Sequence, residues 1–301
     1  MLSCEALTGD ALVDVSSLGR GWEFTDNHMH IDPKNGRGLD AAREFEAAGG
    51  RNIFLVNKNV EDAGIVFRGE RSFEKLFEYT IDLSKEIIVA TNLRCFAVIG
   101  VHPAEFAGMC GRFGVDKALG MGKGAIDIAV GKIEAGEAVA LGEIGVPHYP
   151  VEPHILEACG SLLIYSLEAA SDVDCAVQLH TGSVDEDGMM EYGEMARAAG
   201  LDAGRVVKHF SPPLIKAAAE AGIYPSIVAR DENIKRARKE GNRFLMESDY
   251  IDDLKRPGAV VSPKSVPRVS GELYDLGVLD EDDLWRIHID NVEEVYRVAL
   301  R

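Results

Sequence analysis

The sequence predicts an α/β fold, because eight short apolar runs alternate with seven amphipathic stretches along its 301 residues. Strands that alternate with helices form right-handed βαβ units and a parallel sheet. Eight such units can close into a (β/α)8 TIM barrel, which needs roughly 250 residues. An open doubly wound sheet is the alternative, but no GxGxxG or P-loop pattern follows any run. We therefore expect a single-domain TIM barrel.

The expected strands are the apolar runs. They cover residues 23–30, 52–57, 95–102, 138–145, 175–180, 205–210, 224–229 and 243–249. The stretches between them predict helices at residues 39–49, 72–90, 122–135, 153–171, 187–199, 213–221 and 231–240. In the fourth helix, apolar side chains recur every three or four residues and line one face, at Leu156, Cys159, Leu163, Leu167 and Ala170.

The two ends of the chain lie outside this repeating pattern. Residues 279–300 predict one or two closing helices, packed through Val292, Val295, Tyr296 and Ala299. Residues 1–22 are expected to be an N-terminal extension of a barrel domain at residues 23–301. The extension has acidic residues and no basic segment, so it does not resemble a signal peptide. We expect a cytoplasmic protein.

Composition and charge exclude several classes of function. No run approaches the roughly 18–20 apolar residues that a membrane span needs. The net charge of −18 disfavours general attachment to nucleic acid, which needs basic surface to displace counterions from phosphates. Five scattered cysteines without a CxxC pair indicate reduced thiols and no disulfide framework. The sequence is compatible with a homo-oligomer.

Histidines and acids gather at the ends of the expected strands, where barrel enzymes hold their active sites. His28 and His30 are two residues apart, so they point to the same face of the first strand. Five of the eight histidines end a strand, and carboxylates close two other strands. The full set is His28, His30, His102, Glu143, His180, His209 and Asp249. This agreement predicts a single polar site at one end of the barrel.

The residue types predict a metal site. Imidazoles and carboxylates together suit Zn²⁺ or Mn²⁺, whereas oxygen-only sites suit Mg²⁺ or Ca²⁺. A pair of ions can share a carboxylate, make water nucleophilic near neutral pH and stabilise a leaving oxyanion. We expect two divalent ions, with Zn²⁺ first and Mn²⁺ or Mg²⁺ as alternatives. Hydrolysis of a phosphoester or an amide-type bond is the expected chemistry.

Six short motifs in register resemble one known family. DNHMH, GVHP, LGEIG, QLHT, KHFS and MESD follow the order and approximate spacing of the TatD-related metal-dependent hydrolases. That family is a branch of the amidohydrolase-like TIM barrels. The tail NVEEVYRV is similar to the family's closing helix, so the resemblance covers about residues 23–300.

The resemblance implies a role for each ligand. His28 and His30 would bind one ion, and His180 and His209 would bind the second. Glu143 would bridge the two ions. In urease-like and phosphotriesterase-like barrels a modified lysine holds this bridging place, so no lysine modification is required here.

The resemblance also implies the catalytic pair. Asp249 would ligate metal and handle the proton of the attacking water. Glu143, which would bridge the ions, is the second residue of the pair. His102 lies near the site in the family and would contact substrate, although a structural role is equally open. Pro103 after it fits either role.

The sequence departs from the family pattern in places that shape the substrate pocket. Met29 stands where the family has a short polar residue, and it should face the surrounding helices. Ala104, Glu105 and Phe106 replace a histidine-rich continuation, and a long loop follows Asp249. Metal binding is therefore better supported than the family's deoxyribonuclease activity.

Other polar residues have weaker assignments. Asp26 could orient an imidazole or be a satisfied core aspartate. Glu247 should lie behind the ligands, paired to a base or hydrogen-bonded, because an unpaired buried carboxylate is costly. Lys264 and Arg268, in the loop after the eighth strand, could bind an anionic substrate group or be solvated. Histidines assigned to structure or surface are His148, His154 and His288.

The sequence thus predicts a metal-dependent hydrolase that cleaves a phosphoester in a small molecule or an oligonucleotide. Cleavage of an amide or lactone by the same ions is the alternative within enzymes. A barrel that keeps metal for structure and serves as a scaffold is the alternative outside enzymes, but structural sites are usually closed at four ligands and need no second ion.

Overall fold

The fold is a barrel of parallel strands, and the computed structural model describes residues 21–301. The expected extension at residues 1–22 therefore lies almost entirely outside the described residues. The strands are β1 Phe24–His30, β2 Gly50–Val56, β3 Arg94–Ile99, β4 Ala140–Gly145, β5 Ala176–His180, β6 Val206–Lys208, β7 Tyr224–Val228, β8 Leu245–Glu247 and β9 Tyr250–Ile251. From β1 to β8, each strand pairs with the next in parallel.

The segment that contains β8 and β9 closes the ring. Its first part pairs with β7, and its last part pairs with β1. Between the two parts, the Asp249 N–H donates to the His28 carbonyl at 3.0 Å. The predicted (β/α)8 barrel is confirmed, and its final strand carries a short continuation that the sequence did not indicate.

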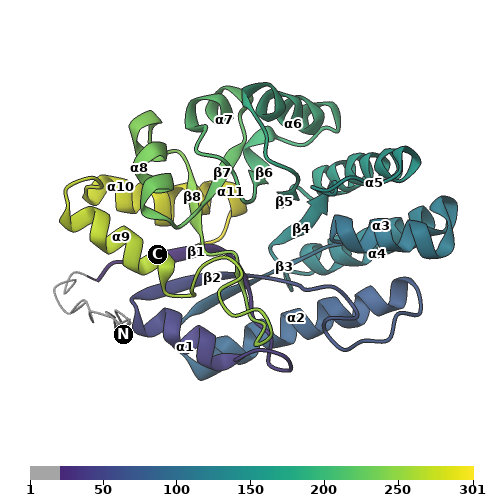
Figure 1. The fold of residues 1–301 in the computed structure, drawn as a ribbon, viewed down its shortest axis with the longest axis horizontal. Helices are drawn as coiled ribbons and strands as arrows, with labels where there is room; N and C mark the ends of the chain where they lie inside the picture. The colour runs from purple at the N-terminus through teal and green to yellow at the C-terminus, as the bar shows by residue number, and fades with distance from the viewer. Residues whose placement is uncertain (1–20) are drawn as a thin grey trace, which may run out of the picture.

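Helices surround the strands, as Figure 1 shows. They are α1 Leu39–Ala47, α2 Glu70–Ala90, α3 Pro103–Phe113, α4 Val115–Glu134, α5 Pro153–Asp172, α6 Glu186–Ala198, α7 Ile215–Ala221, α8 Asp231–Glu240, α9 Ser265–Asp275, α10 Glu281–Trp285 and α11 Asn291–Tyr296. A 3₁₀ turn at Ala203–Arg205 precedes β6, and a π-helical turn at Arg286–Asp290 joins α10 to α11.

Two of these helices, α3 and α9, were not predicted, and α4 is longer than expected. Pro103 occupies the first turn of α3, a position that proline favours, and His102 caps the helix. Glycines in the first half of α4 weaken its helical pattern. A Cβ at Gly122 would lie 3.1 Å from both Leu162 and Phe106, so the close packing of α4 on its neighbours favours glycine there.

The inner faces of the strands form a core with the end of the chain. Phe54, Val98 and Val207 belong to one buried cluster with Val295 and Tyr296 of α11. The Tyr296 ring lies 4.1 Å from the Phe54 ring. The closing helices therefore pack against the strands that carry the predicted site.

Side chains at the end of β1 alternate regularly between the inner and the helix-facing side of the barrel, but those before them do not. Met29 is fully buried in the cluster that contains Ala41 and Phe45 of α1, so its predicted helix-facing position is confirmed. The pairing of β1 with β2 shifts register between Asp26 and Met29. This shift breaks the expected alternation at Asp26.

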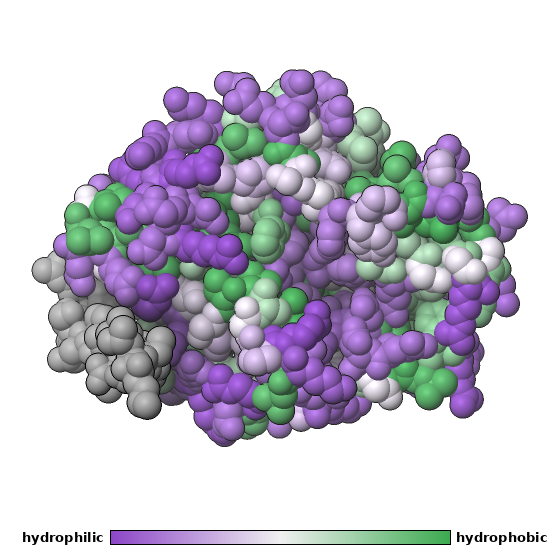
Figure 2. Space-filling model, viewed as in Figure 1, coloured by the Kyte–Doolittle hydropathy of each residue, from purple (hydrophilic) through white to green (hydrophobic). Residues whose placement is uncertain are grey.

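The surface drawn in Figure 2 is mainly hydrophilic, with hydrophobic residues in small separate patches. No helix within residues 21–301 is long and apolar enough to cross a membrane. Cys95, Cys110, Cys159 and Cys175 are buried and free, as predicted, and Cys4 lies outside the described residues.

One buried carboxylate joins the segment after β9 to the segment after β1. Asp252 is fully buried and accepts hydrogen bonds from the backbone N–H groups of Asp32, Arg37 and Gly38, and from the Tyr250 hydroxyl. Asp252→Ala would leave four donors, three backbone N–H groups and the Tyr250 hydroxyl, without their partner. We expect it to lower the free energy of unfolding by about 3 kcal/mol or more, measured by urea denaturation.

Asp253 provides the matched control, because its carboxylate bonds Arg256 on the surface. Asp253→Ala should move the urea midpoint far less, since exposed ion pairs contribute little. Equal midpoint shifts for the two variants would mean that the Asp252 network does not hold this end of the barrel.

Candidate functional site

A pocket of about 690 Å³ lies where the strands end. Its wall includes residues that the sequence placed at strand ends, namely His30, His102, Glu143, His180, His209 and Asp249. His28 is fully buried beneath them, within 4 Å of Glu143 and Asp249. The structure therefore brings together the seven residues that the sequence singled out.

The two histidines of β1 point their ring nitrogens at each other. His28 Nε2 lies 3.1 Å from His30 Nε2. His28 Nδ1 lies 2.8 Å from Gln178 Oε1, and His30 Nδ1 lies 3.1 Å from the Val56 carbonyl. Since both partners are acceptors, both Nδ1 atoms carry hydrogen, and in neutral rings both Nε2 atoms present lone pairs. Only a proton or another cation can lie between them.

The orientation of Gln178 is itself fixed by a buried network. Its Nε2 donates to the Asn27 carbonyl at 2.9 Å and to the Tyr296 hydroxyl at 2.8 Å. Tyr296 in turn donates to Asn27 Oδ1 at 2.8 Å, and Asn27 Nδ2 donates to Ser226 at 3.0 Å. The Gln178 oxygen must therefore face His28.

Glu143 at the end of β4 lies between two groups of histidines. Its Oε2 is 3.7 Å from His28 Nε2 and 3.6 Å from His30 Nε2. Its Oε1 is 2.6 Å from His180 Nδ1 and 3.4 Å from His209 Nε2. One carboxylate thus presents one oxygen to each group.

Asp249 lies between β8 and β9, next to β1, and faces the two β1 histidines. Its Oδ1 lies 3.9 Å from both His28 Nε2 and His30 Nε2. Its backbone adopts a φ of 46°, which is uncommon outside glycine. The bond from its N–H to the His28 carbonyl holds this conformation at the junction of β8 and β9.

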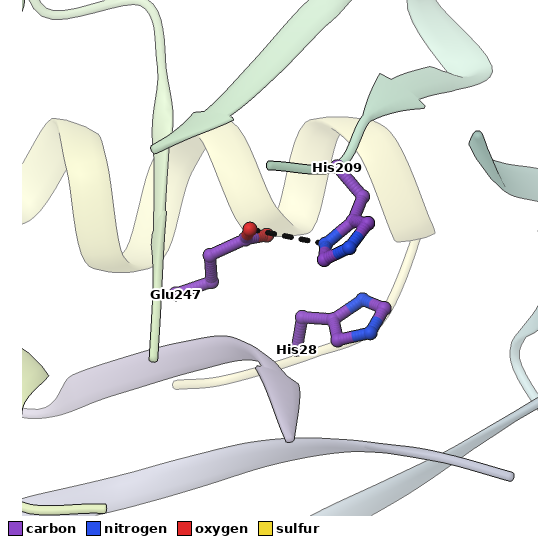
Figure 3. A group of neighbouring side chains, drawn as sticks. All are labelled: His28, His209 and Glu247. Atoms are coloured by element: carbon purple, nitrogen blue, oxygen red, sulfur yellow. Dashed lines mark ion pairs between the residues drawn. The ribbon is translucent and has the colours of Figure 1, made fainter. Parts of the chain in front are cut away.

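Glu247 lies beside His209 and His28, as Figure 3 shows. Its Oε1 is 3.0 Å from His209 Nδ1, and the same oxygen accepts from the Phe210 N–H at 2.8 Å. The His28 and His209 rings stack with centroids 3.8 Å apart. Glu247 is therefore paired with a base behind the pocket, His209, as its sequence position predicted. With Nδ1 beside Glu247, His209 turns its Nε2 toward Glu143.

Burial and neighbouring charges shift the pKa values of several residues in this cluster. Burial alone would raise the pKa of Glu143, but His28, His102 and a hydrogen bond from His180 hold it well below its usual range. Burial alone would lower the pKa of His28, yet the carboxylates of Glu143, Glu247 and Asp249 raise it to about 9. Burial raises the pKa of Asp249 well above its usual range.

The donor set fits divalent metal ions. Ligands about 2.1 Å from a tetrahedral ion lie about 3.4 Å from each other, close to the separations among His28, His30 and Glu143. The groups close enough to hold an ion include His28 with His30 and Glu143, and His102 with Glu143 and His180. These His and Glu groups are suited to bind metal.

Three residues near the ligands were not predicted. Gln178 lies two residues before His180 on β5, so a period of two could have placed it on the inner face. His148, which the sequence assigned to structure or surface, lines the pocket with its Nδ1 2.9 Å from His180 Nε2. Lys208 of β6 is fully buried, and burial lowers its pKa to about 8 although Glu247 opposes the shift.

Asp26 does not orient an imidazole. Its Oδ1 accepts from the backbone N–H groups of His28 at 3.2 Å and Ser248 at 2.9 Å, so it ties β1 to the end of β8. The register shift in β1 explains the difference, because it takes Asp26 off the face that the two histidines share. Of the two predictions for Asp26, a core aspartate is the one that the contacts match, with both hydrogen bonds on Oδ1 and none found for the buried Oδ2 among the described residues.

Lys264 and Arg268 are not brought to the pocket. Lys264 precedes α9 and lies 3.9 Å from Glu44, while Arg268 lies within α9 and bonds Glu272 at 2.6 Å. Neither lines the pocket. The sequence did not indicate α9, so it placed both cations in a loop. His288, by contrast, is buried and accepts from the Thr25 N–H, as a structural histidine would.

Comparisons with known proteins agree with this geometry. The profile of the family described as TatD related DNase matches residues 25–297. The Uncharacterized protein MJ1127 of Methanocaldococcus jannaschii is 37% identical over 278 residues, which is 92% of this chain and 96% of that protein.

Solved structures share the fold at low identity. YJJV, a TatD homologue from Escherichia coli, superposes with a TM-score of 0.63 at 18% identity, over 92% of this chain and 98% of that one. A TatD family hydrolase from Entamoeba histolytica gives 0.58 at 12% identity, over 91% and 99%. An organophosphorus hydrolase from Deinococcus radiodurans gives 0.59 at 13% identity, over 91% and 92%.

The family profile spans nearly all of the barrel, and the motifs that it matches carry the clustered histidines and carboxylates. The chain therefore belongs to the TatD related DNase family and has the fold of a metal-dependent hydrolase.

Proposed function

We propose that the protein is a hydrolase that uses two divalent ions to activate water against a phosphoester bond. The observation that carries this proposal is the convergence of the two β1 imidazoles on Glu143, with their Nε2 atoms 3.1 Å apart. Two neutral rings with unprotonated Nε2 atoms would be unfavourable at this buried place without a cation, either a proton or a metal ion, between them.

His28 and His30 would hold the first ion, together with Glu143 and Asp249. His180 and His209 would hold the second ion with Glu143, whose Oε1 lies 2.6 Å from His180 Nδ1 and 3.4 Å from His209 Nε2. Nitrogen and oxygen donors in this proportion favour Zn²⁺, and Mn²⁺ or Mg²⁺ are the alternatives.

Bound ions would act as Lewis acids that lower the pKa of water and stabilise the charge that develops on the substrate oxygens. Asp249, on the pocket wall, accepts the proton of the attacking water and passes it to the leaving group. His102, also on the wall with its Nε2 4.0 Å from Glu143 Oε2, contacts the substrate. Glu247 keeps His209 in one orientation.

A second candidate is cleavage of an amide or lactone with the same ions. It is favoured by the pocket wall, in which no lysine or arginine is found among the described residues. A non-catalytic scaffold is the candidate of a different class, and it predicts bound metal without turnover.

The test is turnover by protein stripped with a chelator and reloaded separately with Zn²⁺, Mn²⁺ or Mg²⁺. Bis-p-nitrophenyl phosphate, a short oligonucleotide, an amide and a lactone form the panel. We expect metal-dependent release of p-nitrophenol. Turnover of the amide or lactone alone would favour the second candidate, and no turnover with metal bound would favour the scaffold.

The Gln178 network gives a prediction on metal affinity. Gln178→Leu removes the acceptor that fixes the hydrogen of His28 on Nδ1, so Nε2 is no longer held as the ligand atom. We expect Zn²⁺ affinity, measured by competition with a chromophoric chelator, to fall about 10–100-fold, the usual cost of losing a partner of a metal-bound histidine.

Gln178→Glu is the comparison variant, because one carboxyl oxygen can accept the same hydrogen from His28, while the other must carry a proton to replace the hydrogen bond from Gln178 Nε2 to the Asn27 carbonyl. It should retain the Zn²⁺ affinity. Equal losses in both variants would indicate a packing defect and contradict the proposed orienting role.

A further inference from the structure

The apolar part of the pocket points to the chemical class of the substrate. We infer that the pocket takes a small ester whose substituent away from the reacting bond is apolar and uncharged, and that Phe210 contacts this substituent. The inference rests on the proposed hydrolase function, and it deepens that function by separating small apolar esters from strands of nucleic acid.

Four apolar residues line the pocket, beside polar ones such as Ser211 and Asn233. Phe210, Pro212 and Pro213 follow β6, and Ile251 belongs to β9. They lie next to the ligand histidines, since Phe210 directly follows His209 and the two rings are 5.9 Å apart. A substituent that extends from an ester bond at the ions would meet this apolar wall.

Phe210 is held in an unusual conformation for an exposed aromatic residue. Its ring remains 48% exposed, and its φ is 48°, in the left-handed region that residues other than glycine seldom adopt. The Phe210 N–H donates to Glu247 Oε1 at 2.8 Å, the same oxygen that pairs with His209. The buried Glu247 carboxylate thus contacts both the His209 imidazole and the backbone N–H of Phe210. Uncommon backbone of this kind concentrates at functional sites.

The pocket wall lacks the cations that a nucleic acid strand needs. Among the described residues that line it, the ionisable groups are histidines, Glu143 and Asp249. Lys208 is fully buried below the wall and points its ammonium at backbone carbonyls. Lys264 and Arg268 pair with carboxylates elsewhere. Two ions could neutralise one phosphoryl group, but phosphates beyond it would find no cationic side chain on the described wall, only neutral donors such as Ser183 and Asn233.

The experiment compares substrates that share the reacting bond. Phenyl p-nitrophenyl phosphate and thymidine 5′-(p-nitrophenyl phosphate) have the same leaving group and the same single charge at phosphorus. They differ in the substituent, which is an apolar ring in the first and a nucleoside in the second. With the metal-loaded protein we expect kcat/KM at least tenfold higher for the phenyl substrate. Equal values or a preference for the thymidine ester would overturn the inference.

A second pair covers a carboxyl ester as the reacting group. p-Nitrophenyl butyrate has an apolar chain, and mono-p-nitrophenyl succinate has a chain of the same length that ends in a carboxylate. The butyrate should be preferred at least tenfold, and equal kcat/KM values would count against an uncharged substituent.

Phe210→Ala tests the contact itself. Because Phe210 is half exposed, the variant is expected to fold, which its melting temperature will check. We expect KM for the phenyl substrate to rise about tenfold with a small change in kcat, and KM for the thymidine ester to change less. Phe210→Leu should restore most of the KM, and Leu276→Ala, which removes an exposed apolar side chain outside the pocket, should leave it unchanged.

An unchanged KM in Phe210→Ala would contradict the proposed contact. Absence of turnover for every ester would defeat the proposed function separately from this inference. In that case calorimetry with the metal-loaded protein tests the apolar pocket by comparing its affinities for phenylphosphonate and for thymidine 5′-monophosphate. Tighter binding of phenylphosphonate supports the apolar pocket, and equal or weaker binding overturns it.

Discussion

Replacing Glu143 with glutamine is expected to abolish most activity, with kcat/KM at least about a thousandfold lower. Glu143 presents one oxygen to His28 and His30 and the other to His180 and His209. An amide has one ligand oxygen and no negative charge, so it cannot bridge two ions. Loss of one ion would remove several kcal/mol of transition-state stabilisation, and each 1.36 kcal/mol is a factor of ten.

The measurement pairs kinetics with metal content by elemental analysis. Glu143→Gln should bind fewer ions per chain than the unaltered protein, with an unchanged circular dichroism spectrum. Glu157→Gln, an exposed glutamate on α5, is the matched control and should keep both metal and activity. Full metal content in Glu143→Gln would mean that this residue does not bridge.

Asp249→Asn is expected to lower kcat by about 10²–10⁴ while most of the metal is retained. The asparagine oxygen can still lie 3.9 Å from the β1 imidazoles, where Asp249 Oδ1 lies, but an amide cannot accept a proton from the attacking water. The expected size is the range typical of a lost general base. Stopped-flow or steady-state assays on the best substrate of the panel measure it.

Asp253→Asn provides the control for this change, since Asp253 lies four residues later and bonds Arg256 outside the pocket wall. It should leave kcat unaltered. If Asp249→Asn kept both metal and full kcat, another group would have to handle the proton, and the catalytic role of Asp249 would be wrong.

Most of the barrel strands could be predicted because they are short runs rich in apolar residues and buried along nearly their whole length. The helices α3 and α9 could not, since each contains residues that also suit a loop: Pro103, Gly108 and Gly111 in α3, and Pro267 and Gly271 in α9. Pro103 illustrates the ambiguity, because the same residue keeps its predecessor extended and starts a helix well. Gly122 shows the opposite case, in which a residue that weakens a helix is favoured by packing between helices.

The candidate ligands could be predicted because chain order and the barrel rule place strand ends at one point. The groups that orient them depend on contacts across the barrel, which no local pattern contains. Gln178 reaches His28 from β5, and Tyr296 reaches Gln178 from the last helix. The alternative in which Asp26 orients an imidazole assumed regular alternation along β1, and the register shift between Asp26 and Met29 cannot be seen in the sequence.

The most direct test of the central claim is an anomalous difference map from crystals of the zinc-loaded protein, collected on both sides of the zinc absorption edge. The proposal predicts one peak within bonding distance of His28, His30, Glu143 and Asp249, and a second beside His180 and His209. No peak at either place, or peaks only at surface residues outside this pocket, would contradict a binuclear metal centre at the ends of the barrel strands.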